Sequence, residues 1–142
     1  MNLHAYILAF VHLLHPHAID VGDASAIIDA VEASIEADPN HIFGSKEADA
    51  ATMVYLAWKE SSFHGFVTGD GGLAHGAWQL HNGGTSDLLT QAKTALALLH
   101  KDADLCPAMP LAAYASGNCH AGRSIGMHRQ AEVKRLMSLV KP

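Results

Sequence analysis

The chain has 142 residues, of which 49% are hydrophobic and 16% charged, a composition typical of one globular domain and not of a disordered chain. The net charge of −5 at pH 7 argues against a role built on phosphate contacts, so we expect no nucleic-acid partner. The two cysteines, Cys106 and Cys119, are too few for a disulfide scaffold and lack zinc-site spacing. One bridge between them and two buried free thiols are both compatible with the sequence.

The first predicted helix covers residues 1–14, where Leu3, Ile7, Phe10, Val11 and Leu14 recur at helical spacing. The segment has no Lys or Arg near its start, and no small-residue cleavage site follows promptly, as a signal peptide would require. It is also too short to span a bilayer. We therefore expect an amphipathic core helix in a protein made in the cytoplasm without a signal peptide or stable membrane insertion.

Cap and breaker residues predict the next two helices. Pro16 ends the first helix, and Asp23 is a candidate N-cap for a second helix that "DPN" at 38–40 ends. Ser45 is a candidate N-cap for a third helix that runs through Glu60. The second helix should bury Ile27, Ala30, Val31 and Ile35, and the third should bury Ala50, Val54 and Ala57.

Residues 61–84 are rich in glycine and predict a long irregular loop, in which short strands could lie near Phe66 and Val67. Thr85 or Ser86 could cap a fourth helix, residues 110–116 predict a short helix ending at Gly117, and residues 124–140 predict a last helix. The expected fold is a mostly α single domain over residues 1–142, with about six helices, and we expect a monomer. The apolar stripes predicted for the fourth and last helices are Leu89, Ala92, Leu96 and Leu99, and Ile125, Met127, Val133, Leu136 and Val140.

Glu60 stands at the expected end of the third helix. The negative end of the helix dipole disfavours an added anion there, and Trp58 and Phe63 could exclude water from it. Both features favour the neutral acid that proton donation at neutral pH requires. A glutamate at a helix end is also commonly a solvated surface group.

The loop after Glu60 could contribute a binding surface. Its glycines let the backbone approach a bulky ligand, and Gln79 offers a donor and an acceptor. Trp78 has a flat apolar face that could stack on a sugar ring or fill the core. An acid, amides and an apolar surface together suit a carbohydrate with acetamido groups. A glycine-rich loop without any function has the same composition.

Three short motifs strengthen this interpretation: "ESSF" at 60–63, "GAWQL" at 76–80 and "AYASG" at 113–117. In order and spacing they resemble the signatures of soluble lytic transglycosylases and the goose-type lysozyme-like group, which are approximately E-S-x-F, G-x-x-Q and A-Y-N-A-G. The resemblance covers residues 45–117, and "GDGGLAHGAWQ" and "YASGNCHAG" look especially like phage and prophage members. It implies a lysozyme-like fold.

The resemblance also implies roles for individual residues. Glu60 matches the catalytic acid/base, and Ser61 matches the serine that follows it, a helix-end or site-shaping residue. Gln79 matches the glutamine that binds N-acetyl or hydroxyl groups, and Trp78 takes the hydrophobic position before it. Tyr114 matches the tyrosine whose hydroxyl lies near the catalytic carboxylate. The chain departs from the family where "AS" at 115–116 replaces Asn-Ala, so an asparagine contact is in doubt.

The implied reaction is cleavage of the β-1,4 bond between N-acetylmuramic acid and N-acetylglucosamine in peptidoglycan. Glu60 would act alone, and the sugar's 6-hydroxyl would close a 1,6-anhydro ring; attack by water would make the enzyme a muramidase. Asp70 is a candidate second carboxylate, although Asp before Gly is also a turn signal, which we favour. We expect no cofactor and peptidoglycan glycan strands as the partner. The expected setting is a phage endolysin or virion lysin that reaches the cell wall through a holin or an injection apparatus.

Two other functions fit parts of the sequence. A non-catalytic wall-binding or structural module could keep the same fold. A zinc-dependent wall amidase would need two or three of His64, His75 and His81 with an acid such as Asp87, but their spacing matches no zinc signature. We expect no metal, and we expect His81 to touch substrate. His4, His12, His15 and His17 are interpreted as structural or surface residues.

Overall fold

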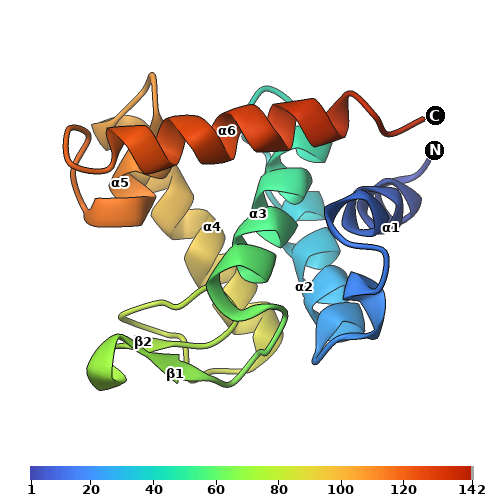
Figure 1. Cartoon of the computed structure of the whole chain (residues 1–142), viewed down its shortest axis with the longest axis horizontal. Helices are drawn as coiled ribbons and strands as arrows, with labels where there is room; N and C mark the ends of the chain where they lie inside the picture. Colours follow the sequence, from blue (N-terminus) through green and yellow to red (C-terminus); the bar gives the residue numbers. More distant parts are fainter. Residues whose placement is uncertain (142) are drawn as a thin grey trace.

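Helices make up most of the chain in a computed structural model, which describes residues 1–141. Within these residues the structure has six α-helices and one small antiparallel strand pair (Figure 1). The prediction of a mostly α fold with about six helices is therefore confirmed. The elements are α1 (Leu3–Leu14), α2 (Ala24–Glu36), α3 (Lys46–Ser61), β1 (Thr68–Gly69), β2 (Ala74–His75), α4 (Leu88–Leu105), α5 (Pro110–Ser116) and α6 (Arg123–Met137).

Helix α3 runs through the middle of the molecule and contacts α1, α2, α4 and α6 (Figure 1). Its residues from Ala48 to Ala57 are all buried, because small side chains let neighbouring helices approach on every side. Ser45 caps α3 as predicted, since its hydroxyl accepts a hydrogen bond from the Ala48 amide at 3.1 Å. The helix ends one residue later than expected, where Ser62 adopts a left-handed conformation. Glu60 therefore lies in its last turn.

The first two helices support α3 from one side. Helix α1 buries Leu3, Ile7, Phe10 and Val11, so the predicted core role of this segment is confirmed. Within residues 1–141, no helix has both the length and the apolar character needed to cross a membrane.

Asp23 precedes α2 as predicted, but its side chain does not cap that helix. Its carboxylate instead accepts a hydrogen bond from the Gly65 amide at 2.7 Å, and its own amide donates to the Phe63 carbonyl at 2.7 Å. The start of α2 is thereby fastened to the loop that follows Glu60.

Two apolar stripes were predicted in part wrongly. The N-cap of α4 is Asp87, where Thr85 or Ser86 was predicted. Leu89 is exposed, because α4 packs against its neighbours through the face that holds Gln91, Ala92 and Leu99. The Gln91 amide group lies in this interface and bonds to the backbone of Gly65, Ala77 and Ser86.

On α6 the contact with α5 is made at Gly126, where an added Cβ would collide with the backbone of Ala112. Ile125 and Met127 flank this contact and are exposed, while Val133 and Leu136 are buried as predicted.

A disulfide joins Cys106 to Cys119, so the first of the two alternatives for the cysteines holds in this structure. Cys106 follows the end of α4, and Cys119 lies between α5 and α6. Helix α5 ends at Gly117, with φ of 80°, as the sequence predicted. The bridge therefore fixes the short helix that carries Tyr114 between two longer ones.

Candidate active-site cleft

A cleft of about 750 Å³ lies among the end of α3, the loop after β1, one face of α4, and helices α5 and α6. Six of the seven residues predicted for the site line it, and only Ser61 does not. The lining residues used below are Glu60, Asp70, Trp78, Gln79, His81, Leu98, Lys101, Asp102, Leu105, Tyr114, Ile125 and Arg129.

Glu60 forms an ion pair with Arg129 at the cleft. Its Oε1 accepts a hydrogen bond from Arg129 Nη1 at 2.7 Å, and the Glu60 side chain is 24% exposed. Trp58 packs against Phe63, with ring centroids 5.3 Å apart, and against His15. The neutral state expected of Glu60 stays a prediction, and the structure adds Arg129 as the partner of its carboxyl group.

The sequence analysis did not identify Arg129. It comes from α6, 69 positions after Glu60, so no local pattern connects the two residues. Its side chain is 19% exposed, which is low for a residue of a solvated helix face. Because Arg129 stands between His128 and Gln130 in a polar stretch, its type and position gave no signal of this contact.

Gln79 lines the cleft from the loop. Its backbone is in the left-handed region at φ 50°, and its side-chain amide donates to the Gly76 carbonyl at 3.0 Å and, more weakly, to the Val67 carbonyl at 3.4 Å. A Cβ on Gly69 would collide with the Gln79 side-chain oxygen. A side chain at position 69 would therefore displace the Gln79 amide group, which its two hydrogen bonds hold against the loop.

Tyr114 connects the short helix to the loop. Its hydroxyl donates a hydrogen bond to the Trp78 carbonyl at 2.7 Å. Burial, together with the nearby Glu60 carboxylate, raises the pKa of Tyr114 far above its ordinary value. The residue thus stays neutral, and its hydroxyl lies within electrostatic reach of Glu60, as the resemblance implied.

Trp78 and Ser61 take the structural one of the alternatives that the sequence left open, although both stood among the candidate substrate-binding residues. The Trp78 side chain is 1% exposed and its ring nitrogen donates to the Met53 carbonyl at 2.9 Å, so the ring fills the core and only the backbone of Trp78 borders the cleft. The Ser61 hydroxyl donates to the Ala57 carbonyl at 2.9 Å. Ser61 is therefore a helix-end residue, which was the structural alternative.

Asp70 and His81 lie together at the exposed rim. Asp70 begins a 3₁₀ turn between β1 and β2 at φ 49°, so its favoured interpretation as a turn residue agrees with the structure. His81 Nε2 lies 3.8 Å from Asp70 Oδ2, and both side chains are more than two-thirds exposed. The pair could touch a bound ligand but lies in a solvated environment.

Asp102 is a third carboxyl group of the cleft, after Glu60 and Asp70, and the sequence analysis did not identify it. The residue is 6% exposed, and its Oδ2 has no hydrogen-bond partner within residues 1–141. Burial raises its pKa to about 6, against the smaller opposing effect of Lys101. The available signal was an acid at helical spacing from Leu98, Leu99 and Leu105 in an otherwise apolar stripe.

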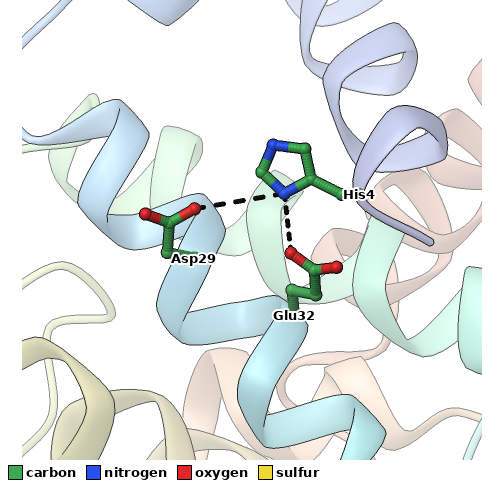
Figure 2. Close-up of side chains that lie close together, drawn as sticks. All are labelled: His4, Asp29 and Glu32. Carbon is green, nitrogen blue, oxygen red and sulfur yellow. Dashed lines mark hydrogen bonds and ion pairs between the residues drawn. The ribbon is translucent and has the colours of Figure 1, made fainter. Parts of the chain in front are cut away.

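One cluster within residues 1–141 has the composition of a metal site, and it lies outside the cleft. His4 of α1 faces Asp29 and Glu32 of α2 (Figure 2), with His4 Nδ1 2.6 Å from Glu32 Oε2 and 4.0 Å from Asp29 Oδ1. A hydrogen bond between a histidine and a carboxylate explains this geometry without an ion. In the described part of the chain, no such cluster includes His64, His75 or His81.

Comparisons of the chain with family models, with curated proteins and with solved structures gave no match.

Proposed function

We propose that the protein is a peptidoglycan-cleaving glycosidase, a lytic transglycosylase or a muramidase, that acts on the β-1,4 bond between N-acetylmuramic acid and N-acetylglucosamine. One observation carries this proposal. Glu60, Gln79 and Tyr114, one from each of the three motifs, line the same cleft although they come from a helix end, a loop and a later helix. The lysozyme-like fold and the phage setting implied by the motifs are part of the same proposal.

The chemistry of the cleft suits a neutral glycan. Amide and hydroxyl groups of Gln79, Asn82 and Ser116 can exchange hydrogen bonds with sugar hydroxyls, and exposed apolar side chains such as Ile125 can cover the faces of sugar rings. In the proposed reaction, Glu60 donates a proton to the glycosidic oxygen and the bond to C1 breaks. Glu60 then accepts a proton from the attacking 6-hydroxyl or from water.

This role requires a change in the ion pair. While Arg129 donates to Glu60 Oε1, this oxygen is engaged and is not free to approach a glycosidic oxygen. A bound glycan must therefore separate Arg129 from Glu60 before the carboxyl group can act.

A second candidate, a wall-binding module without catalysis, is favoured by the same ion pair. If Glu60 serves only to fasten α3 to α6, the cleft could hold glycan strands without cutting them. Glu60→Gln separates the two candidates, because the amide cannot donate a proton to a leaving group. Clearing of purified peptidoglycan should fall by at least 100-fold if Glu60 is the acid.

The matched control is Glu36→Gln, which changes an exposed glutamate outside the cleft. It should clear peptidoglycan at the normal rate. Sedimentation with insoluble peptidoglycan should show that Glu60→Gln still binds, and circular dichroism should show that it still folds. Mass spectrometry of the wild-type digest identifies the reaction, since an anhydromuramoyl end is one water lighter than a reducing end. Full clearing by folded Glu60→Gln would refute the catalytic role.

A further inference from the structure

The side of the cleft formed by α4 combines a buried acid with apolar side chains. Leu98, Lys101, Asp102 and Leu105 all line the cleft, and their positions along the chain place them on one face of the helix. Leu105 is exposed, Leu98 is half-buried, and Asp102 lies between them with 6% of its surface exposed. This wall is separate from Gln79, which borders the cleft from the loop.

A buried carboxyl group without a partner needs an explanation, because an unsatisfied polar atom costs free energy. Within residues 1–141, the Oδ2 of Asp102 is the only buried side-chain oxygen or nitrogen that has no hydrogen-bond partner. No catalytic step proposed above uses it. Because Asp102 lines the cleft, a turn of its carboxyl group would bring this enclosed oxygen to a ligand there.

We propose that Asp102 forms the polar end of an acetamido subsite, in which its protonated carboxyl donates a hydrogen bond to the carbonyl oxygen of an N-acetyl group. The flanking Leu98 and Leu105 contact the methyl of that group. An acetamido group carries an acceptor oxygen beside a methyl, which matches an acid between two leucines. The choice of ligand rests on the proposed function.

The charged groups around Asp102 allow it to hold a proton under mildly acidic conditions. Its pKa of about 6 reflects burial, and Lys101 on the same helix opposes this effect only in part. Across the cleft, Tyr114 of α5 is neutral, while Glu60 and Arg129 act on Tyr114 from α3 and α6 as an ion pair. Below pH 6 the acid can donate a hydrogen bond; above it, the carboxylate repels a carbonyl oxygen.

Titration calorimetry with two neutral trisaccharides tests the subsite. The probe is the trisaccharide of N-acetylglucosamine, and cellotriose, which has hydroxyls in place of the acetamido groups, is the matched ligand. The wild type should prefer the N-acetylated sugar, and its affinity for that sugar should fall about three- to tenfold between pH 5 and pH 7.5, the loss of one hydrogen bond. Cellotriose should bind weakly at both pH values.

Three variants assign the effect. Asp102→Asn keeps a donor without a titrating proton, so it should bind the N-acetylated sugar equally well at both pH values. Asp102→Ala should lose the preference over cellotriose. Asp104→Asn, an exposed acid of the same helix outside the cleft, should behave as the wild type. A pH dependence of the same size that persists in Asp102→Asn would refute the role of Asp102.

The subsite is refuted if the wild type binds both sugars alike, if its affinity for the N-acetylated sugar does not fall with pH, or if Asp102→Asn behaves as Asp102→Ala. The proposed function is tested separately, because clearing of peptidoglycan by the wild type and its loss in Glu60→Gln do not depend on these affinities. If the protein binds the N-acetylated sugar as described but clears no peptidoglycan, the subsite is supported and the proposed enzymatic function is refuted.

Discussion

Arg129 Nη1 lies 2.7 Å from Glu60 Oε1, and this contact joins the last turn of α3 to the middle of α6 across the cleft. Both side chains are partly shielded from water, so the pair is more than a surface contact. It links the residue with the strongest motif assignment to a residue that belongs to no motif.

Replacing Arg129 by Gln should free the Glu60 carboxyl group for substrate. Glutamine is uncharged and shorter than arginine, so it should hold the carboxylate less tightly than the 2.7 Å ion pair does. We expect the rate of peptidoglycan clearing at pH 7 to rise roughly three- to tenfold and the melting temperature to fall by a few degrees. Turbidity assays and thermal melts measure the two effects. A lower rate in a fully folded variant would mean that Arg129 positions Glu60 or binds substrate.

Replacing Gly69 by Ala should disturb Gln79 without removing it. The φ of Gly69 is −133°, a conformation that alanine adopts freely, so the new methyl acts only through its collision with the Gln79 side-chain oxygen. We expect weaker binding of the N-acetylglucosamine trisaccharide, about three- to tenfold, from one displaced hydrogen bond.

Gln79→Gly is the matched variant for this prediction, because it removes the amide while glycine accepts the φ of 50°. The double variant should bind no more weakly than Gln79→Gly alone, since the methyl then has nothing to displace. Additive losses would show that Gly69 acts by another route.

Asp102 should make stability depend on pH. Its folded-state pKa of about 6 lies above the ordinary 3.8, so the folded protein holds the proton more tightly than the unfolded chain. The resulting stabilisation is fully present below about pH 3.8 and is lost as the pH rises through 6. The difference between the two pKa values corresponds to about 3 kcal/mol in the free energy of unfolding.

Urea unfolding at pH 4 and pH 7 measures this effect. Asp102→Asn should be more stable than the wild type at pH 7 by up to about 3 kcal/mol and nearly equal to it at pH 4. Asp104→Asn should follow the wild type at both pH values. If Asp102→Asn changed the stability equally at pH 4 and pH 7, the assignment to Asp102 would be contradicted. The pKa of the buried Asp49 is also raised, but Asp49 is present in all three proteins and its effect cancels in the comparison.

Removing the disulfide should destabilise the wall of the cleft. Cys106 and Cys119 are 13 positions apart, and closing a loop of that size in the unfolded chain corresponds to about 3 kcal/mol. We expect the Cys106→Ser/Cys119→Ser double variant to lose about that much unfolding free energy. A reducing agent should lower the stability of the wild type to a similar level and leave the double variant unchanged. Equal stability of the oxidised and reduced wild type would show that the bridge contributes nothing.

Sequence patterns located the helices well where the signals are local. Ser45 and Gly117 act through backbone groups within a few residues, so their type and position are sufficient to predict where a helix begins or ends. Asp23 had the same appearance, but its carboxylate bonds to Gly65, 42 positions away. An aspartate before a helix looks the same in the sequence whether it caps that helix or accepts a long-range hydrogen bond, and only the packing of the chain decides which it does.

The site was predictable in its motif residues and not in their partners. From the sequence, Trp78 could equally face a sugar or the core. In the structure its ring nitrogen donates a hydrogen bond to the Met53 carbonyl of α3, which places the ring in the core. Arg129 and Asp102 belong to helices α6 and α4. The apolar residues at helical spacing predict which face of each helix is buried, but not which residue of another helix packs against it. The exposed Ile125 shows the same limit, because the close approach at Gly126 turns it away from the core and into the cleft.

The hydrogen bond between the Gly65 amide and the Asp23 carboxylate gives the first part of the chain, which holds none of the three motifs, a structural role at the cleft. A shortened protein that starts at residue 41 would retain all three signatures, yet the segment after Glu60 would lose its carboxylate anchor, and α3 would lose the two helices packed beside it. Any transfer of this cleft into another scaffold must therefore include residues 1–36, because α1 and α2 support α3 and Glu60 although neither helix lines the cleft.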